Sequence, residues 1–558
     1  MSNATTLLAK MTGFLSAALR CLLLCALLTA GACIQDKGNY DYHDVNSITI
    51  SDINDVHESY LVSVGEYLKI TPTLKFSLGE ERDTYRYEWR QMGNIAPYRS
   101  VRLLSTERNL NLKIEGSMSY SQTYYLMYCV TNLTTGVRYD HVFKVTVQNK
   151  ISKGYVVLHE QAGSDFNIDL IAAYGDSLTR YAGVLDMFES SLPRAGRKPL
   201  DVLCYYDYTA PTPYDPSNHL RYSLWVLTDK GADRIKAEDY SYNPDYNISK
   251  LSLIPAAVLG GKELVAEKMV ATMPGEVPSN ARSYMYFNGC WFFFNLPIMP
   301  YFFNLPINVL PGAGATPYTV APYIMPVSYY GAIMFDEDSR HFMLHQTNTE
   351  DMLNSSKIYS SQKITSEKKY FAWGDSTYRL VYMGNRTWQT GFAVVKKAST
   401  DSCALLQMML EKSGAVQLGK SNFQQLPAGL SVEDFKHFAY HPTLPYLYCA
   451  TEDKVYKILV STMAITDVTE QVIPAGSKLS VLEFLFVRAP RPGLLAVATY
   501  DPGGEAGSNG ALAFYAAEDG TGNLTLAPHP AQRTDNGYQV EMKWTGFGKI
   551  VALDYKEQ

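Results

Sequence analysis

Pairs of apolar strands joined by polar turns recur from Gly154 to the C-terminus, at intervals of roughly 40 to 70 residues. One hairpin sheet of this kind has two apolar faces and buries both only when it stacks against neighbours on each side. The repeat therefore predicts a seven-bladed β-propeller over residues 152–558, in which the final strand, FGKIVALDY, pairs with GYVVLHE and closes the ring. A long β-solenoid or two fused sandwiches remain as alternatives. The seven units are GYVVLHEQAGSDFNIDLIAA, YSLWVLTDKGADRIKA, SYMYFNGCWFFF, GAIMFDEDSRHFMLHQ, RLVYMGNRTWQTGFAVVKK, YLYCATEDKVYKILV and GLLAVATYDPGGEAGSNGALAFYAAEDGTGNL.

A second strand pattern precedes these units. Between residues 46 and 150 the runs SITISDI, YLKITPTLKF, YRYEWRQ, LNLKIEG, YYLMYCVTN and HVFKVTVQN alternate apolar and polar side chains and are separated by turn residues. This spacing is typical of an immunoglobulin-like or PKD-like β-sandwich, and Trp89 stands where such sandwiches place a core tryptophan. Cys129 has no second cysteine to pair with across the sheets. The fold class predicted for the chain is all-β.

The most apolar stretch, WFFFNLPIMPYFFNLPI at residues 291–307, belongs to a longer segment without charge, since no Asp, Glu, Lys or Arg occurs between Arg282 and Asp336. Its prolines interrupt every window long enough for a membrane-spanning helix. Burying each ring stabilises the fold by roughly 1.5 to 3 kcal/mol. We expect Phe292, Phe294 and Phe303 to lie in the core, and any part left outside to contact a partner protein.

The N-terminal residues have the features of an export signal. Lys10 and Arg20 precede the apolar run CLLLCALLTAGAC, which predicts a signal peptide over residues 1–32. The ending Ala30-Gly31-Ala32-Cys33 resembles a bacterial lipobox, although alanine replaces the usual leucine three positions before the cysteine. We expect Cys33 to be acylated and to anchor the chain in a membrane, with residues 33–45 as a tether. A plain signal peptide cut near Ala32 is the alternative.

Charge and cysteine content limit the partners of the mature chain. Without Lys10 and Arg20 it has 47 basic and 55 acidic side chains, a net charge of −8, which argues against a nucleic-acid partner. The cysteines that remain besides Cys33 are odd in number and far apart, so neither a disulfide framework nor a zinc site is indicated. We expect buried free thiols at Cys129, Cys204, Cys290, Cys403 and Cys449.

Several segments together resemble the PKD-like family lipoproteins of Bacteroidetes: CIQDKGNYDY after the signal, the YEW strand, GYVVLHE, FDEDSRHF and TGFGKIVALDYKE. The resemblance implies an outer-membrane lipoprotein that is exposed on the cell surface, is encoded beside a SusC/SusD-like transporter and captures a nutrient, either glycan or peptide. The WDFGDG turn of PKD domains is absent after Trp89, where RQMGN stands instead.

No catalytic motif accompanies these features. The sequence contains no HExxH, GxSxG, Walker or EF-hand pattern, so we predict no catalytic residue, no cofactor and no metal. The carboxylates of FDEDSRHF suit a hairpin turn better than a calcium site. His437 and His441 are four residues apart, but Pro442 argues for strand and turn. Paired carboxylates brought together from separate blades would have no sequence spacing, which keeps a glycoside hydrolase or lyase as the alternative.

Tyrosine is unusually frequent, at 42 of 558 residues, and clusters in segments rich in Pro and Asp that we expect to form loops. Tyrosine and tryptophan combine a flat apolar face with a hydrogen-bonding tip, which suits sugar rings and peptides. Packing between blades is the competing explanation for any single ring. The candidate ligand-binding residues are Tyr206, Tyr214, Tyr329, Tyr330 and Trp388. The sequence thus predicts a binding protein and not an enzyme, with a structural subunit of a transporter assembly as a further alternative.

Overall fold

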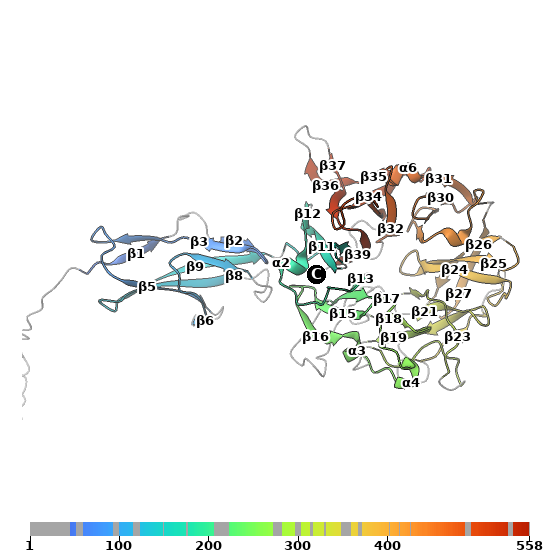
Figure 1. Cartoon of the computed structure of the whole chain (residues 1–558), viewed down its shortest axis with the longest axis horizontal. Coiled ribbons are helices and arrows are strands. Elements are labelled where there is room, and N and C mark those ends of the chain that lie inside the picture. Colours follow the sequence, from blue (N-terminus) through green and yellow to red (C-terminus); the bar gives the residue numbers. More distant parts are fainter. Residues whose placement is uncertain are drawn as a thin grey trace, which may run out of the picture.

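The computed structural model describes residues 45–556, apart from residues 52–59, 93–99, 115–122, 149, 164, 175–176, 206–222, 272–281, 296–302, 313–315, 328–330, 348–358, 366–370, 401, 412, 424–425, 486–492 and 534–538. The predicted signal peptide, Cys33 and all but the last residue of the tether lie outside these residues. The chain is all-β and consists of an elongated N-terminal part and a larger part whose sheets surround a common centre (Figure 1). Within the described residues no helix is long and apolar enough to cross a bilayer.

The N-terminal part is a sandwich of short strands. The largest sheet has the order β2-β9-β8-β5-β6, and β1 with β4 and β3 with β7 form two-stranded sheets. Trp89 is fully buried in the core, as the sequence predicts, and its indole packs 4.5 Å from the ring of Tyr128. The strands are β1 (Ile48–Ser51), β2 (Tyr60–Ser63), β3 (Tyr67–Ile70), β4 (Thr73–Phe76), β5 (Tyr85–Met92), β6 (Ser100–Ser105), β7 (Leu110–Lys113), β8 (Thr123–Asn132) and β9 (Arg138–Gln148).

The larger part is β-propeller-like, and its described residues form seven main sheets, which we number 1 to 7. Sheet 1 contains β10 (Gly154–Gln161), β11 (Asp165–Tyr174), β12 (Ser177–Tyr181) and β39 (Ile550–Lys556); sheet 2 contains β13 (Pro199–Tyr205), β14 (Ser223–Thr228), β15 (Gly231–Lys236) and β16 (Tyr242–Asn247); sheet 3 contains β17 (Lys268–Ala271), β18 (Arg282–Phe287) and β19 (Cys290–Asn295). Sheet 4 contains β20 (Met325–Val327), β21 (Gly331–Asp336), β22 (His341–Gln346) and β23 (Gln362–Lys363).

The remaining sheets come from the last third of the chain. Sheet 5 contains β24 (Tyr378–Asn385), β25 (Thr390–Lys397), β26 (Cys403–Leu410) and β27 (Val416–Asn422); sheet 6 contains β28 (His437–Tyr440), β29 (Tyr446–Ala450), β30 (Val455–Leu459) and β31 (Ala464–Asp467); sheet 7 contains β32 (Lys478–Phe484), β33 (Leu494–Tyr500), β34 (Gly510–Ala517) and β35 (Leu524–Leu526), with β38 (Lys543–Phe547) beside β34. β36 (Pro528–Arg533) and β37 (Gln539–Glu541) pair separately. The short helices are α2 (Val184–Met187), α3 (Ile248–Leu251), α4 (Ala256–Leu259), η3 (Val432–Asp434) and α6 (Thr469–Val472).

The predicted pairing of the last strand is confirmed. β39 lies antiparallel to β10, with Gly154 opposite Lys556 and Leu158 opposite Ala552. Sheet 1 is therefore completed by residues from both ends of the propeller-like part. Leu553 and Tyr555 of β39 also enter a buried cluster with Ala496, Leu512 and other residues of sheet 7. The end of the chain thus joins the first sheet to the last one.

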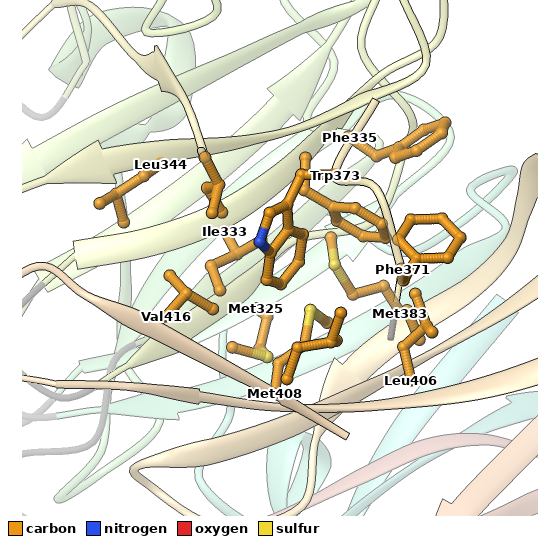
Figure 2. Close-up of a cluster of buried hydrophobic side chains, with 14 of the residues drawn as sticks. Met325, Ile333, Phe335, Leu344, Phe371, Trp373, Met383, Leu406, Met408 and Val416 are labelled. Carbon is orange, nitrogen blue, oxygen red and sulfur yellow. The ribbon is translucent and has the colours of Figure 1, made fainter. Parts of the chain in front are cut away.

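Apolar packing between consecutive sheets holds this part together. Each of its buried clusters draws on two neighbouring sheets, and Figure 2 shows the one between sheets 4 and 5, where Met325 and Ile333 meet Met383, Leu406 and Met408. Clusters of the same kind join sheets 1 and 2, 2 and 3, 3 and 4, 5 and 6, 6 and 7, and 7 and 1. Each sheet therefore buries both of its faces, as the stacking argument requires.

The uncharged stretch around residue 300 belongs largely to this packing. Phe292, Phe294 and Phe303 are almost fully buried, which confirms their assignment to the core. Phe294 and Phe303 pack between sheets 2 and 3, whereas Trp291 and Phe293 pack between sheets 3 and 4. Of this stretch, residues 296–302 lie outside the described residues. The five predicted buried thiols are likewise confirmed as free and buried.

The two parts touch at Phe188 and Glu189, the two residues that follow α2. Phe188 packs against the sandwich core and also against the cluster between sheets 1 and 2. The Lys113 ammonium on β7 lies 2.6 Å from the Glu189 carboxylate. Because the ion pair is exposed, the shared ring contributes most of the attachment.

We expect removal of β39 to abolish the cooperative unfolding of the propeller-like part. A chain ending at Lys549 loses the antiparallel partner of β10 and takes Ile550, Leu553 and Tyr555 out of the cluster between sheets 7 and 1. Thermal unfolding followed by circular dichroism tests this, with a chain ending at Lys556 as the matched control because it retains β39. An equal melting temperature for the two truncations would show that the pairing of β39 with β10 contributes nothing to stability.

Candidate ligand-binding cavity

The innermost strands of the sheets surround a central cavity of about 580 Å³. In each of sheets 2 to 7 the first strand along the chain is an edge strand, and it forms the inner edge of that sheet. In sheet 1 the inner edge strand is β39. The inner strands of sheets 1 and 2 are also in direct contact, since the Cys204 backbone N–H on β13 donates to the Asp554 carboxylate on β39 at 2.6 Å. The lining residues are Leu200, Asp201, Glu267, Lys268, Met269, Val270, Trp291, Pro322, Tyr323, Ile324, Tyr382, Met383, Gly384, Asn385, Phe438, Ala439, Tyr440, Glu483 and Phe484.

Irregular pairing in three inner strands coincides with the polar lining. The register of β13 shifts between Pro199 and Asp201, and that of β24 shifts between Leu380 and Tyr382. β32 has a similar shift between Leu479 and Val481, two residues before Glu483. A bulge of this kind bends a strand and turns the following side chains, and bulges are common beside functional sites. They provide a local reason why polar side chains face the centre here.

Three acidic residues, Asp201, Glu267 and Glu483, and one lysine, Lys268, line the cavity. Asp201 on β13 accepts a hydrogen bond from the Val202 backbone N–H at 2.8 Å. Lys268 on β17 donates to the Pro322 carbonyl oxygen at 3.0 Å, and its ammonium lies 4.4 Å from the centre of the Tyr323 ring. Glu483 on β32 has no hydrogen-bond partner among the described residues. The carboxyl groups therefore have spare capacity on the side that faces the cavity.

The carboxyl groups of Asp201 and Glu483 hold their protons unusually strongly. Burial, together with the negative charges of Asp201 and Asp554, raises the pKa of Glu483 to about 8. Burial and the charge of Asp554 raise the pKa of Asp201 to about 7, although Lys268 opposes that change. Burial lowers the pKa of Lys268. Raised carboxyl pKa values of this kind are frequent in binding and catalytic sites because both need charged groups away from bulk water.

Aromatic rings form most of the remaining wall. The rings of Tyr323 and Tyr382 meet edge to face at 5.2 Å, and Tyr382 stacks on Phe438 at 4.9 Å. Phe484 continues the wall on β32. Within the described residues, neither the Tyr323 nor the Tyr382 hydroxyl has a hydrogen-bond partner. The cavity therefore combines apolar faces with hydroxyl and carboxyl groups that are available to a ligand.

Two other hollows are less suited to specific binding. A groove of about 900 Å³ is lined by β26, β27 and residues 426–432, so it belongs essentially to one sheet. A hollow of about 300 Å³ shares Leu200 with the central cavity and contains Lys198, Lys436 and His437. Burial lowers the pKa of His437 to about 4. Of these three hollows, only the central cavity gathers side chains from sheets 2, 3, 5, 6 and 7 and from the segment that precedes β20.

Of the aromatic residues predicted from the sequence, only Trp388 lies within the described residues. It is 44% exposed in the turn between β24 and β25, three residues after Asn385 of the cavity wall. Arg386 fixes this turn against sheet 6, because its guanidinium donates to the carbonyl oxygens of His441 and Leu444. Tyr206, Tyr214, Tyr329 and Tyr330 lie outside the described residues.

The structure explains the other polar motifs as turns. The Asp336 carboxylate accepts hydrogen bonds from the backbone N–H groups of Asp338 and Ser339, so FDEDSRHF forms a hairpin turn, as predicted. His437 begins strand β28, and His441 Nδ1 accepts from the Leu444 backbone N–H. In the part of the chain that the structure describes, no three His, Cys, Asp or Glu side chains lie close enough together to bind one metal ion.

Sequence reasoning missed the cavity residues themselves. Asp201, Lys268 and Glu483 come from three sheets and have no fixed spacing along the chain. A weak signal is present, because each is a charged residue within or at the start of an otherwise apolar short strand, for example Asp201 in PLDVLCY and Glu483 in KLSVLEF. Such a signal identifies single positions but does not show that these side chains line the same cavity.

Comparisons with known proteins give one family match, which covers part of the chain, and several distant likenesses to solved structures. A sequence model of the PKD-like family matches residues 33–190, less than a third of the chain. A search of curated proteins found no match. Among solved structures, a quinonprotein alcohol dehydrogenase-like protein from Bacteroides thetaiotaomicron is 12% identical, with 90% of this chain and 99% of that chain covered and a TM-score of 0.40. The dihydro-heme d1 dehydrogenase NirN has 9% identity, coverage of 73% and 76%, and a TM-score of 0.34. The GH74 xyloglucanase from Xanthomonas campestris has 12% identity, coverage of 59% and 45%, and a TM-score of 0.28.

We expect Glu483→Gln to stabilise the protein more at pH 8 than at pH 5. The folded chain keeps this proton up to a pKa of about 8, whereas the unfolded chain loses it near the ordinary glutamate pKa of 4.5. The folded state therefore binds more protons between these values, and the stability of the wild type falls as the pH rises through that window. The variant lacks this loss, which is on the order of 2 kcal/mol.

Urea unfolding at pH 5, 6.5 and 8 measures the difference in unfolding free energy between variant and wild type. Asp519→Asn, which removes one carboxyl group from an exposed turn, is the control. A Glu483→Gln difference that stays constant across the three pH values would contradict the raised pKa.

Proposed function

We propose that this chain is an exported binding protein whose central cavity captures a small polar part of a nutrient, either glycan or peptide. The observation that supports the proposal is the meeting of Asp201, Lys268 and Glu483 with an aromatic wall in one cavity. Its volume of about 580 Å³ lies within the usual range for small-molecule sites. The seven sheets are, in this proposal, the blades of a closed seven-bladed β-propeller.

Capture fits the unused hydrogen-bonding capacity of the wall. The carboxyl of Glu483 and the hydroxyls of Tyr323 and Tyr382 have no partners among the described residues. Polar groups held deep in a fold destabilise it unless something hydrogen-bonds to them. A hydroxylated or amide-bearing ligand supplies such bonds, and the rings of Tyr382 and Phe438 offer flat faces for its apolar side.

The same carboxyl groups support a second candidate, a glycoside hydrolase. Glycosidases use two carboxyl groups, of which one is protonated and the other ionised. Asp201 and Glu483, with pKa values raised to about 7 and about 8, are the two groups that would take these roles. Capture is the primary proposal because no described hydrogen bond orients Glu483 as an acid for a leaving group.

The proposed setting is the cell surface. Acylated Cys33 would anchor the chain in the outer membrane, and the sandwich that follows would hold the propeller-like part away from the lipid. The contact of Phe188 with both cores supports a sandwich that acts as a spacer and not as a loosely tethered module. A SusC/SusD-like transporter is the proposed recipient of the captured nutrient.

The anchoring part of the proposal predicts that Cys33→Ala loses lipid labelling and leaves the membrane fraction. The thioether to lipid forms only at this cysteine, whereas Cys25 is removed with the signal. Metabolic labelling with a palmitate analogue and cell fractionation measure both effects, and Cys25→Ala is the matched control. Continued labelling of the Cys33→Ala protein would refute the assignment, and protection of the wild type from protease added to intact cells would refute surface exposure.

The capture proposal predicts that cavity substitutions weaken binding while the fold survives. Glycan and peptide arrays would first identify a ligand of the chain beginning at residue 46, and calorimetry would then compare the variants. Glu483→Gln and Tyr382→Phe each remove one hydrogen-bonding group without changing size, so we expect a loss of about 1 kcal/mol, roughly fivefold in Kd.

Trp388→Ala distinguishes the cavity from the outer turn. A ligand that loses affinity through Trp388→Ala but not through the cavity variants binds at the turn, as the sequence alone would predict. Turnover of a bound glycan that stops in Glu483→Gln, with binding retained, would establish the hydrolase instead. Absence of any array ligand together with co-purification of a transporter would favour an assembly subunit.

A further inference from the structure

Charge is distributed unevenly around the central cavity. The Lys268 ammonium on β17 interacts electrostatically with Asp201 and Glu267. The part of the cavity formed by β13 and β17 therefore contains a cation of the protein itself. The groups that act electrostatically on Glu483 are Asp201 on β13 and Asp554 on β39, both acidic. The Tyr382 phenol on β24 also feels the Glu483 charge. Among the described residues, no cation compensates the Glu483 side.

From this arrangement we infer that the cavity selects ligands that bear a protonated amine, with the ammonium group placed between Glu483 and the aromatic wall. The inference rests on the proposed function and specifies the chemical class of its ligand. An ammonium group is the missing charge on this side, and it can donate hydrogen bonds to the carboxyl oxygens that have no partner. Amino sugars and lysine-bearing peptides are the two sources of this chemistry.

The aromatic wall is suited to an organic cation. Phe438, Phe484 and Tyr382 line the cavity on the side of β24, β28 and β32. A cation above an aromatic face is attracted by the ring quadrupole, and the attraction increases when water is excluded. Lys268 already makes this contact on the other side, where its ammonium lies 4.4 Å from the Tyr323 ring centre. A ligand ammonium would repeat it beside Glu483.

A metal ion fits the same site less well. The described residues bring no three carboxylate, imidazole or thiol groups within reach of one ion. Asp554 is turned toward protein, since its carboxylate accepts the backbone N–H groups of Cys204 and Tyr555. An ammonium group needs only one or two carboxyl oxygens and tolerates apolar rings beside it, whereas Ca²⁺ requires six or more oxygens.

The like charges also explain why such a ligand would bind. Asp201, Glu483 and Asp554 disfavour one another's ionisation, which contributes to the raised pKa of Glu483. An ammonium group beside Glu483 favours the ionised form of its carboxyl group, which releases a proton to the solvent. Without a ligand the carboxyl groups repel one another, whereas in the complex the ionised Glu483 carboxylate attracts the ligand ammonium.

Calorimetry with matched probes tests the inference on the chain beginning at residue 46. N-acetyl-lysine amide has an ammonium with a pKa of about 10.4, and N-acetyl-norleucine amide has a similar side chain without it. Glucosamine and N-acetylglucosamine, compared at pH 6.5, form the corresponding sugar pair. We expect at least one amine to bind at least tenfold more tightly than its neutral counterpart, and Glu483→Gln to abolish that difference. Asp519→Asn should retain it.

Two results would overturn the inference, and they differ in what else they imply. If neutral ligands bind as well as the amines and lose affinity in Tyr382→Phe, the cavity captures ligands without a need for charge, and the proposed function stands. If neither the probes nor any array ligand binds, the proposed function fails and the inference fails with it. The outcome for the sugar pair relative to the lysine pair identifies the source of the amine.

Discussion

The burial of both faces of every sheet is the constraint on which the rest of this structure depends. Each buried cluster of the propeller-like part is shared by two consecutive sheets, so no sheet is stable without the neighbours on either side. Sheet 1 meets this condition only because β39, from the far end of the chain, supplies its inner strand and joins it to sheet 7. The packing of each sheet against the next brings the inner strands of sheets 2, 3, 5, 6 and 7 around one cavity.

That arrangement separates the side chains that stabilise the fold from those that can bind a ligand. The second and third strands of a sheet, such as β29 and β30, are buried on both faces and contribute most of the apolar area. An inner strand needs only one row of side chains for packing against neighbouring sheets, which leaves another row facing the cavity. Asp201 and Glu483 occupy such rows beside shifts in register. The Glu483 carboxyl group, which has no hydrogen-bond partner among the described residues, destabilises the fold, and the packing between the sheets offsets this effect.

The same separation explains how much the sequence alone could predict. The hairpins GYVVLHEQAGSDFNIDLIAA and YLYCATEDKVYKILV, predicted from the repeat, correspond to strands with long apolar runs. The prediction that Trp89 and Phe292 lie in the core is confirmed, because large apolar side chains are buried whatever the details of the fold. Inner strands such as β28, with the four residues HFAY, or β17, which begins at Lys268, are too short and mixed to produce a periodic signal. Their side chains meet only through the tertiary fold, so the sequence showed carboxylates and tyrosines but not which of them lie together.

The electrostatics of the cavity also make its two candidate functions incompatible in one state. A glycosidase needs Glu483 or Asp201 to hold a proton until the glycosidic oxygen receives it. Burial, together with the repulsion from Asp554, provides the raised pKa of both groups. An ammonium ligand beside Glu483 would lower the pKa of both carboxyl groups and remove the acid. A cavity occupied by an amine is therefore a binding site without a proton donor, whereas a cavity that cleaves glycosides must hold a neutral sugar. The charge of the ligand thus determines which chemistry the same residues can perform.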